Sequence, residues 1–537
     1  MRRKVPDMLS SATSSAGRRS RPTRRSVLAL SALAGAGAVL AGCGVLKKGG
    51  AASGKDSGSA ASARAAVAAS TGPHGGVVLD TEYKGAPLTV EVGPVAVKDK
   101  YSVARFHMSS DSEEAVYLSQ AFAIGANVST TADVRMMSLE RSVVYPELAR
   151  NNKDLGGAVS KGKPVEAFPV FAALSDEVRS VEMLLPNMGV VIGIPVVAAS
   201  DVDFDIDDVI AKAKLNESDP GPFELERAAV SMDGSSDTKQ DETSTTVTVA
   251  GDVTFATDSD QLSAQADAVL AGAVEQIKKY PSGGELTTTG HTDDVADDAH
   301  NQDLSERRAE AVSERLKELT DLSRWNQSVS GEGESSPRVP NDSDERRQAN
   351  RRVEITLTPS KPAEAGASPS ASAAPSSATM PDPAGPVGKG PEGVDVTVEG
   401  KTVRMSIDHV VRVGEYVTGK VVLTSDEKVY MPLSSLALPG KLMELRGLSG
   451  LFDVSSLTIL SGGLRHLEAD YAYSDGRRFP LANNYVYDLE PGVSQSLPVV
   501  WPDVGEDSVM IDIPAGEYRY ARERIIARLT DVPVVDA

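Results

Sequence analysis

The sequence predicts a multidomain protein in which a central α+β domain, with the order β-α-β-α-β and a mixed sheet, is flanked by two mainly-β domains of the immunoglobulin-like sandwich type. Three observations support this prediction. The chain has 537 residues, more than one domain usually contains. Low-complexity stretches divide it into blocks. Long helical spacing of apolar residues is concentrated in the middle block.

The charge balance and the single cysteine exclude some classes of protein. The chain carries 76 acidic and 55 basic residues, for a formal net charge of -21. This excess of negative charge disfavours a nucleic-acid partner, because phosphate binding needs a basic surface. With one cysteine, the chain cannot form an internal disulfide. We expect no cofactor.

Residues 1–42 have the features of an export signal. A basic segment precedes an apolar run from Val27 to Ala41, which is shorter than the roughly 20 residues of a membrane-spanning helix and typical of a signal peptide. The run ends in Leu40-Ala41-Gly42-Cys43, which resembles a bacterial lipobox. The resemblance implies cleavage before Cys43 and lipidation of its thiol; an uncleaved anchor helix with an incidental cysteine is the alternative.

Lipidation determines the predicted location. Two acyl chains on Cys43 would hold the protein at the extracytoplasmic face of the cell membrane. Residues 23–28 also resemble a twin-arginine export signal, although Val27 stands where that motif usually has Phe or Leu. The twin-arginine and the general export routes both stay open.

Segments with too little apolar content to fold alone set the expected domain boundaries. After Cys43, residues up to 72 form a Gly/Ala/Ser linker, and residues 232–245 and 359–392 form a polar linker and a Pro/Ala/Ser linker. The predicted domains are therefore a β-sandwich at 73–231, a central α+β domain at 246–358 and a second β-sandwich at 393–537.

Short apolar runs separated by Gly, Pro, Asn and Asp predict the strands of both flanks. Examples are Leu88–Val97, Val103–Met108, Ala115–Phe122, Val190–Val197, Val394–Val398, Thr402–Ile407, Tyr416–Leu423 and Val509–Ile513. The flanks also resemble each other, since Val116-Tyr117-Leu118 recurs as Val429-Tyr430-Met431. We interpret them as an internal repeat, with chance similarity of strand-rich segments as the alternative.

The middle block alternates strands with helices. A strand at Thr246–Phe255 precedes a helix capped near Ser263, and a second helix is expected to begin at Ser305 as its N-cap. Further strands are expected at Glu285–Thr289 and Arg352–Leu357. Ala309, Val312, Leu316 and Leu319 would form the buried stripe of the second helix.

Several motifs at fixed spacing lie in this block: VTFATDSDQL from Val253, GHTD at Gly290–Asp293, NQDLSERRAEAV from Asn301, GEGESSP from Gly331 and RQANRRVEI from Arg347. Together they resemble the OmpA-like C-terminal domain family, which includes the peptidoglycan-associated lipoproteins. The resemblance covers about 110 residues. One position departs from it, because Ala296 stands where the family usually has Gly. Alanine fits only if the backbone there has negative φ.

The resemblance implies binding of peptidoglycan through the diaminopimelate residue of its stem peptide. Asp293 would accept from the ammonium of that residue, and Arg308 would hold its carboxylate. Helix N–H groups near Arg308 would add a favourable dipole. Asn301 would bind the peptide or brace the loop, and Thr292 and Leu304 would line the pocket. Arg347 and Arg351 would support or extend the site.

Other interpretations of the same residues stay open. Asp293 and Arg308 would also suit a structural ion pair, and His291 is expected to be a structural turn residue. The alternating acids from Asp201 to Asp207 lack the Gly and Glu of an EF-hand and are expected to point outward from a strand. We predict no metal site, because the histidines are scattered along the sequence: His74, His107, His291, His300, His409 and His466.

The predicted function is a membrane-anchored lipoprotein that binds peptidoglycan non-covalently and tethers membrane to cell wall. The alternative is an envelope adaptor or receptor whose β-sandwiches bind a protein partner, with wall binding only for positioning. The chain has no G-x-S-x-G motif, no P-loop and no paired carboxylates of a glycosidase, so we predict that it is not an enzyme. Whether the stem peptide carries the meso or the LL isomer is left open.

Overall fold

The computed structural model describes residues 70–118, 121–122, 134–148, 157–256, 259–361, 380–432, 434–448, 454–482, 486–517 and 523–537. The predicted signal peptide, Cys43 and most of the linker at 43–72 lie outside these residues. Within the described part, no helix has the length and apolar character needed to cross a bilayer.

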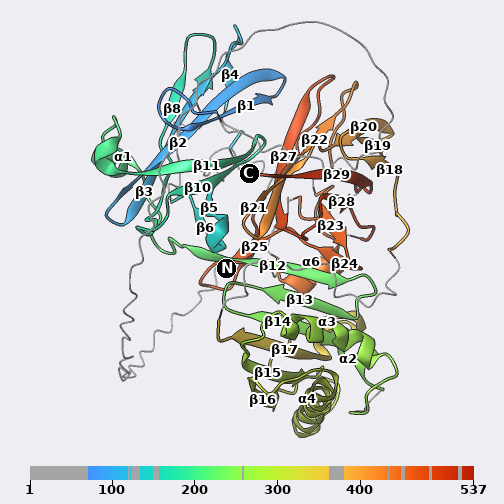
Figure 1. The fold of residues 1–537 in the computed structure, drawn as a ribbon. Coiled ribbons are helices and arrows are strands. Elements are labelled where there is room, and N and C mark those ends of the chain that lie inside the picture. The colour runs from blue at the N-terminus through green and yellow to red at the C-terminus, as the bar shows by residue number, and fades with distance from the viewer. Residues whose placement is uncertain are drawn as a thin grey trace, which may run out of the picture. The chain divides into compact units, whose positions relative to one another are not determined.

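The first block is rich in strands (Figure 1). Its elements are β1 (Val77–Tyr83), β2 (Ala86–Lys98), β3 (Tyr101–Ser109), β4 (Val116–Tyr117), β5 (Arg135–Ser138), η1 (Leu139–Arg141), β6 (Val143–Pro146), β7 (Ala158–Val159), β8 (Val165–Ala167), β9 (Val170–Ala172), β10 (Ser180–Leu185), β11 (Gly189–Ala198), η2 (Ala199–Asp201), α1 (Ile206–Lys212) and β12 (Phe223–Ser231). Apolar side chains such as Val90, Phe106 and Met136 are fully buried in its core.

The middle block forms a five-stranded mixed region of sheet with the neighbours β13-β14-β17-β15-β16. Only β15 and β16 are parallel to each other. The elements are β13 (Ser236–Gln240), β14 (Thr245–Ala250), α2 (Gly251–Thr254), α3 (Ala266–Lys278), β15 (Gly284–His291), α4 (Asp298–Leu319), β16 (Trp325–Gly331), α5 (Asp344–Asn350) and β17 (Arg352–Pro359).

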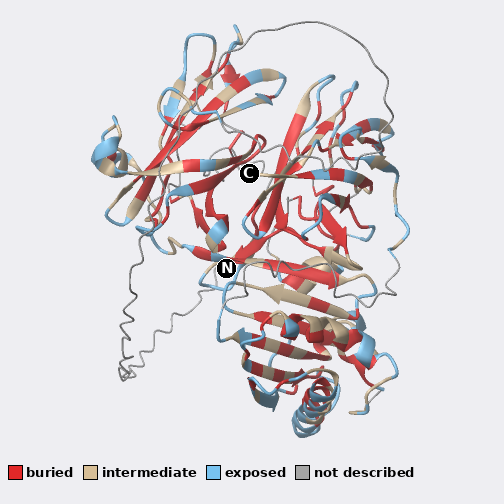
Figure 2. Ribbon diagram, in the orientation of Figure 1, coloured by how far each residue is buried: buried red, intermediate tan, exposed pale blue. Residues whose placement is uncertain are grey.

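The core of the middle block lies between α3, α4 and the sheet. Leu270 of α3 and Val312 and Leu316 of α4 pack in one cluster with Leu286 and Ile355. Buried and exposed positions alternate along α4 with helical spacing (Figure 2). This is the amphipathic pattern that the sequence predicts for this helix. Ala309, Val312 and Leu316 of the expected stripe are buried, whereas Leu319 is only partly buried.

The last block is again mainly β. Its elements are β18 (Val387–Lys389), β19 (Val394–Val398), β20 (Lys401–Ser406), β21 (Val410–Val413), β22 (Tyr416–Thr424), α6 (Gly440–Arg446), β23 (Thr458–Ser461), β24 (Leu464–His466), β25 (Asp470–Ala472), β26 (Arg478–Pro480), β27 (Ser494–Pro502), β28 (Ser508–Asp512) and β29 (Arg528–Asp536). The strand-rich, multidomain prediction is therefore confirmed, whereas the immunoglobulin-like assignment of the flanks stays a prediction.

The two flanks share a pattern of strand pairing. β2 runs parallel to β11, and β21 runs parallel to β29. The hairpins β10–β11 and β28–β29 both shift register, at Val181/Met183 and at Val509/Ile511. Ser110 Oγ donates to Pro87 O at 2.5 Å, and Ser425 Oγ donates to Thr402 O at 2.7 Å. Repeated irregularities at matching places favour the internal repeat over chance similarity.

The prediction of an unstructured linker at 232–245 is wrong. β13 occupies its centre and pairs with β12 on one side and β14 on the other. The strand forms without apolar alternation because backbone hydrogen bonds on both edges and polar side-chain contacts stabilise it. Asp237 accepts two hydrogen bonds from Arg338, each at 2.8 Å. In the other predicted linker, residues 362–379 are outside the described residues, and β18 forms at its end.

Several elements of the middle block also differ from the prediction. The first strand ends at Ala250, and α2 follows it. The second helix begins at Asp298 with Asp297 as its N-cap, so Ser305 lies inside it, and Arg308 is not near its N-terminus. β16 and α5 add a strand and a helix to the expected order. Asp is as good an N-cap residue as Ser. The helix therefore begins after the earlier cap, Asp297, and its polar first turns precede Ser305.

The alternating acids Asp201–Asp207 are not on a strand, which corrects another prediction. They span η2, the turn after it and the start of α1, where Asp205 caps the helix by accepting from the Asp208 N–H at 3.0 Å. Asp203 pairs with Arg105 and Asp207 pairs with Lys98, each at 2.5 Å. These acids are therefore used in a cap and in ion pairs.

Candidate functional site

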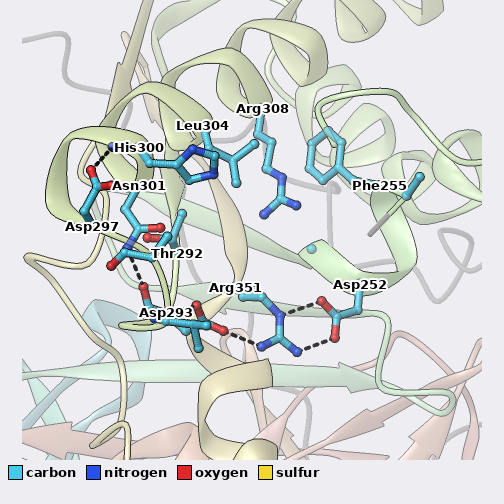
Figure 3. A pocket seen from close by; sticks show the side chains of 14 residues that line it. Asp252, Phe255, Thr292, Asp293, Asp297, His300, Asn301, Leu304, Arg308 and Arg351 are labelled. Carbon is cyan, nitrogen blue, oxygen red and sulfur yellow. Dashed lines mark hydrogen bonds and ion pairs between the residues drawn. The ribbon is translucent and has the colours of Figure 1, made fainter. Parts of the chain in front are cut away.

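A cavity of about 780 Å³ opens on the middle block. The loop after β15, the first three turns of α4, the short helix α2 with the residues that follow it, and Arg351 at the end of α5 surround it (Figure 3). Its walls are formed by Gly251, Asp252, Phe255, Ala256, Thr292, Asp293, Val295, Ala296, Asp297, His300, Asn301, Leu304, Arg308 and Arg351. Six of the seven predicted binding residues therefore meet at one cavity, although they are spread over sixty residues of sequence.

Asp293 is held in place by an arginine bridge. The residue is 7% exposed, and its Oδ2 accepts from Arg351 Nη1 at 2.5 Å. Arg351 is itself fixed by Asp252, whose two carboxylate oxygens accept from Nε at 2.7 Å and from Nη2 at 2.6 Å. The hydrogen bonds with Asp252, followed by those with Asp293, raise the pKa of Arg351 above its ordinary value. The Asp252–Arg351–Asp293 chain thus orients the acid through Arg351 and not through Arg308.

Arg308 lies across the cavity from this chain, on α4 (Figure 3). It is 6% exposed, its Nε donates to Ser259 O at 2.9 Å, and its guanidinium carbon lies 5.2 Å from the centre of the Phe255 ring. The carbonyl and the ring fix the plane of the guanidinium, because a cation is attracted to the face of an aromatic ring. The cation is therefore presented to the cavity in a defined orientation.

Asn301 braces the loop between β15 and α4. It is 2% exposed, and its Nδ2 donates to Asp293 O at 3.1 Å, Ala296 O at 3.3 Å and Glu334 Oε2 at 2.6 Å. Of the two roles expected for this residue, these contacts favour bracing. Ala296 is not among the described residues with positive φ, so alanine fits the loop without backbone strain.

Thr292 contributes a buried hydroxyl to the cavity wall. The residue is 3% exposed, and its Oγ1 has no hydrogen-bond partner among the described residues. A buried polar group without a partner costs about 1–3 kcal/mol, a cost that a polar ligand in the cavity would remove. Leu304, 6% exposed, adds apolar surface from α4.

The GHTD segment owes its glycine to close packing. A Cβ on Gly290 would collide with the Ser305 carbonyl group of α4. The Ser305 hydroxyl in turn accepts from the Gly333 N–H at 2.9 Å, and Gly333 O accepts from the Thr292 N–H at 2.9 Å. The close contact between α4 and β15 therefore fixes the position of Thr292 and Asp293, which follow β15 and line the cavity.

His291 belongs to the support of the site. It is 4% exposed and is absent from the residues that line the described cavity. Burial, followed by the charge of Arg352, lowers its pKa to about 4. The ring is therefore neutral at physiological pH, which favours the structural role expected from the sequence. His291 is, however, the last residue of β15 and does not lie in the expected turn.

One predicted residue lies apart, and other wall residues were missed. Arg347 is not among the cavity residues; its Nε donates to Asp294 Oδ1 at 2.7 Å. Asp252, Phe255, Asp297 and His300 were not predicted to line the site. Phe255 belongs to the VTFATDSDQL motif, so its place in the site could have been predicted from the sequence. Asp252 lies outside the motif, and only its contact with Arg351 in the fold indicates its role.

The arrangement suits a small zwitterion. An acid and a guanidinium face one cavity from different elements, with a hydroxyl and apolar groups between them. Such a set recognises an ammonium and a carboxylate on the same ligand, since each charge finds an oppositely charged partner with directional hydrogen bonds.

Comparison with known proteins identifies the middle block. Residues 254–351 match the model of the OmpA family, so the resemblance inferred from the motifs is confirmed and this block is an OmpA-like domain. Outer membrane porin F of Pseudomonas aeruginosa is 40% identical over 111 residues, which are 21% of this chain and 31% of that protein. Photosystem I P700 chlorophyll a apoprotein A2 of Gloeobacter violaceus is 36% identical over 111 residues, 20% of this chain and 12% of that protein.

The matches with solved structures also cover only a small share of this chain. The cell wall anchor of the T6SS from Pseudomonas aeruginosa is 30% identical with a TM-score of 0.21, covering 24% of this chain and 89% of that one. The peptidoglycan-associated lipoprotein from Burkholderia pseudomallei is 25% identical with a TM-score of 0.17, covering 19% and 86%. The chain thus spans less than a third of the curated relatives, and the likeness is limited to one domain.

Proposed function

We propose that this protein is a lipid-anchored cell-envelope protein whose OmpA-like domain binds peptidoglycan non-covalently and so tethers the membrane to the cell wall. The proposal extends to this chain what the names of two similar structures say of those proteins, a cell wall anchor and a peptidoglycan-associated lipoprotein. The observation that carries it is the placement of Asp293 and Arg308 on one cavity of about 780 Å³.

Diaminopimelate in the stem peptide is the ligand that we propose for this cavity. Its side chain ends in an ammonium and a carboxylate on the same carbon. The ammonium would donate to the Asp293 carboxylate, which Arg351 already orients. The carboxylate would accept from Arg308, and the Thr292 hydroxyl would gain a partner. A stem peptide with lysine lacks that carboxylate and would lose the contact with Arg308.

Binding to isolated sacculi tests the proposal with a matched pair of variants. Arg307 and Arg308 are neighbours on α4, but Arg307 is absent from the cavity wall and pairs with Asp260 at 3.1 Å and with Asp303. We expect Arg308→Ala to reduce the bound fraction strongly and Arg307→Ala to leave it near that of the parent. Equal retention of both variants would rule out the assignment of Arg308.

A competition experiment tests whether the protein recognises diaminopimelate itself or another part of the polymer. A free stem peptide that contains diaminopimelate should displace the parent protein from sacculi, whereas the same peptide with lysine in place of diaminopimelate should not. Displacement by both peptides would show that only the side-chain ammonium is recognised, which contradicts the role proposed for Arg308.

The membrane end of the tether rests on Cys43. Lipidation of this cysteine would anchor the chain at the extracytoplasmic face of the membrane, leaving the folded blocks free to reach the wall. Mass spectrometry of the mature N-terminus should find acyl chains on Cys43. The Cys43→Ser variant should appear in the soluble fraction, and its retention in the membrane would contradict lipid anchoring.

A second proposal, that the flanks capture a protein partner, is favoured by two exposed tyrosines. Tyr117 is 69% exposed and Tyr430 is 59% exposed, and they occupy the matching positions of the internal repeat. Deleting residues 393–537 would be a poor test because β12 pairs with β24 and β25. Tyr117→Ser combined with Tyr430→Ser is cleaner: the adaptor function requires lost partner capture with unchanged wall binding.

A further inference from the structure

We propose that the first block holds a site for a divalent transition metal, with His74, His107 and Glu166 as its ligands. One imidazole nitrogen from each histidine and one carboxylate oxygen of Glu166 all lie within 4.8 Å of one another. Two imidazoles and a carboxylate are donors that Zn²⁺ prefers. His74 and His107 are thirty-three residues apart in the sequence, and the fold brings them together.

Strand register aligns the site. Glu91 of β2 is the direct partner of His107 of β3, and His107 is the direct partner of Glu166 of β8. Direct cross-strand partners project from the same face of a sheet. Glu91, His107 and Glu166 therefore form one row across the three neighbouring strands β2, β3 and β8.

A tight loop brings His74 onto this row. Residues 71 and 77 close it through an isolated bridge, and the Gly72 N–H donates to Gly76 O at 2.9 Å. Inside the loop, the N–H groups of His74 and Gly76 donate to Glu91 Oε1 at 2.8 and 3.0 Å. The centre of the His74 ring then lies 4.7 Å from that of the His107 ring.

The loop sequence is suited to this close approach. Gly75 has a φ of +85°, a conformation that favours glycine. A Cβ on Gly72 would collide with the carboxylate of Glu91. The Gly-Pro-His-Gly-Gly segment is thus shaped around Glu91, and one result is a histidine held against a second histidine.

Glu91 supplies an independent reason to expect a cation. The residue is 3% exposed, and its Oε2 has no hydrogen-bond partner among the described residues. Burying a carboxylate is costly unless its charge is compensated. The two backbone N–H groups satisfy Oε1 only. A metal ion bound by its neighbours in the same row would compensate the remaining charge.

The charged residues around Glu166 are compatible with a bound cation. Arg105 donates to Glu166 Oε1 and pairs with Asp203 at 2.5 Å. Asp203 thus offsets the arginine, and the second carboxylate oxygen of Glu166 is available to a metal. His107 Nδ1 lies 3.5 Å from Glu166 Oε1. A ligand–ligand separation of about 3.3 Å is expected for bonds of about 2.0–2.1 Å in a tetrahedral site. The ligand atoms, now within 4.8 Å of one another, therefore need to approach by up to about 1.5 Å.

The ion would tie the 71–77 loop to the sheet at the start of the first folded block. The predicted flexible linker ends at residue 72, at the start of this loop. A metal at this place would therefore fasten the point at which a flexible tether joins the folded part of the protein. Metal-bound sites contribute to folding stability because binding occurs only in the folded state.

Zn²⁺ titration of the tag-free mature chain, in competition with a chromophoric chelator, tests the proposal. We expect one Zn²⁺ per chain, with His74→Ala and His107→Ala each weakening binding by about tenfold or more. Glu166→Gln should also weaken it. His409→Ala is the matched control, since His409 pairs with Asp408 at 2.9 Å in the last block.

Substitution of Co²⁺ gives a second readout that does not depend on a variant folding. The parent chain should show the strong visible absorption of a four-coordinate Co²⁺ site, and Zn²⁺ should abolish it by displacement. Absence of stoichiometric binding to the parent would overturn the proposal. So would equal affinity of the parent and both histidine variants, which would show that His107 and Glu166 form only a structural contact.

Discussion

Arg308 and Arg446 are both buried arginines on helices, 6% and 3% exposed, but their surroundings differ. Arg446 pairs with Asp470 at 2.5 Å and with Glu226 at 2.6 Å, and Arg478 binds the same two acids. Arg308 contacts an aromatic ring and a backbone carbonyl and lines an open cavity. Burial alone therefore does not identify a binding arginine; what matters is whether the guanidinium lies inside a closed ion-pair network or at the wall of a cavity.

The largest expected effect breaks the closed network. Arg446→Ala would leave Asp470 and Glu226 buried with one arginine between them. Removing one partner of a buried ion pair costs about 3–5 kcal/mol. Chemical denaturation should show this as a loss in the free energy of unfolding of the transition that includes the last block. A loss below about 1 kcal/mol would mean that water reaches the network.

His291 next to the cavity should govern stability in acid. Its folded pKa of about 4, set first by burial, lies below the ordinary value of 6.5. Between these values the unfolded chain binds a proton that the folded chain does not, so stability should fall as the pH drops from 6.5 to 4. The loss is up to about 3 kcal/mol.

Thermal unfolding of the parent and of His291→Asn across this pH range measures the contribution. The variant should have a flatter pH dependence than the parent. Because His291 does not line the cavity, the His291→Asn variant should bind peptidoglycan at neutral pH about as well as the parent. Parallel pH profiles for the two proteins would show that another group is responsible.

Asp293→Asn tests the acidic side of the cavity. The substitution keeps the shape of the side chain but removes the charge that would hold an ammonium and that pairs with Arg351. Hydrogen bonds to charged groups contribute about 1.5–3 kcal/mol, so affinity for a diaminopimelate-containing stem peptide should fall by about 10- to 150-fold. Calorimetric titration measures the change, and an unaltered dissociation constant would place the ligand elsewhere.

Arg347→Ala should have the smallest effect. Arg347 pairs with Asp294 on the surface, where ion pairs contribute about 0–1 kcal/mol. Its absence from the cavity wall predicts a change in wall affinity of less than about fivefold. A loss as large as that for Asp293→Asn would show that the ligand extends beyond the cavity to this side chain.

Much of the site could be predicted because the motifs resemble those of the OmpA-like family. Asp293, Arg308, Asn301, Thr292, Leu304 and Arg351 all meet at the cavity, as that resemblance implied. Asp252 and the pairing of His74 with His107 were not visible in this way. Their neighbours are distant in sequence, and strand register rather than local pattern brings them together.

The sequence by itself determined the strand-rich flanks, the amphipathic helices of the middle block and the chemical types of the cavity residues, because these follow from local periodicity and motif spacing. Tertiary structure decided which charges neutralise one another. Asp293 is oriented by Arg351, Arg347 binds Asp294, and the polar segment around Asp237 becomes a strand. Each of these outcomes depends on partners that approach only after folding, and a charge can be assigned a role only when its nearest opposite charge is known.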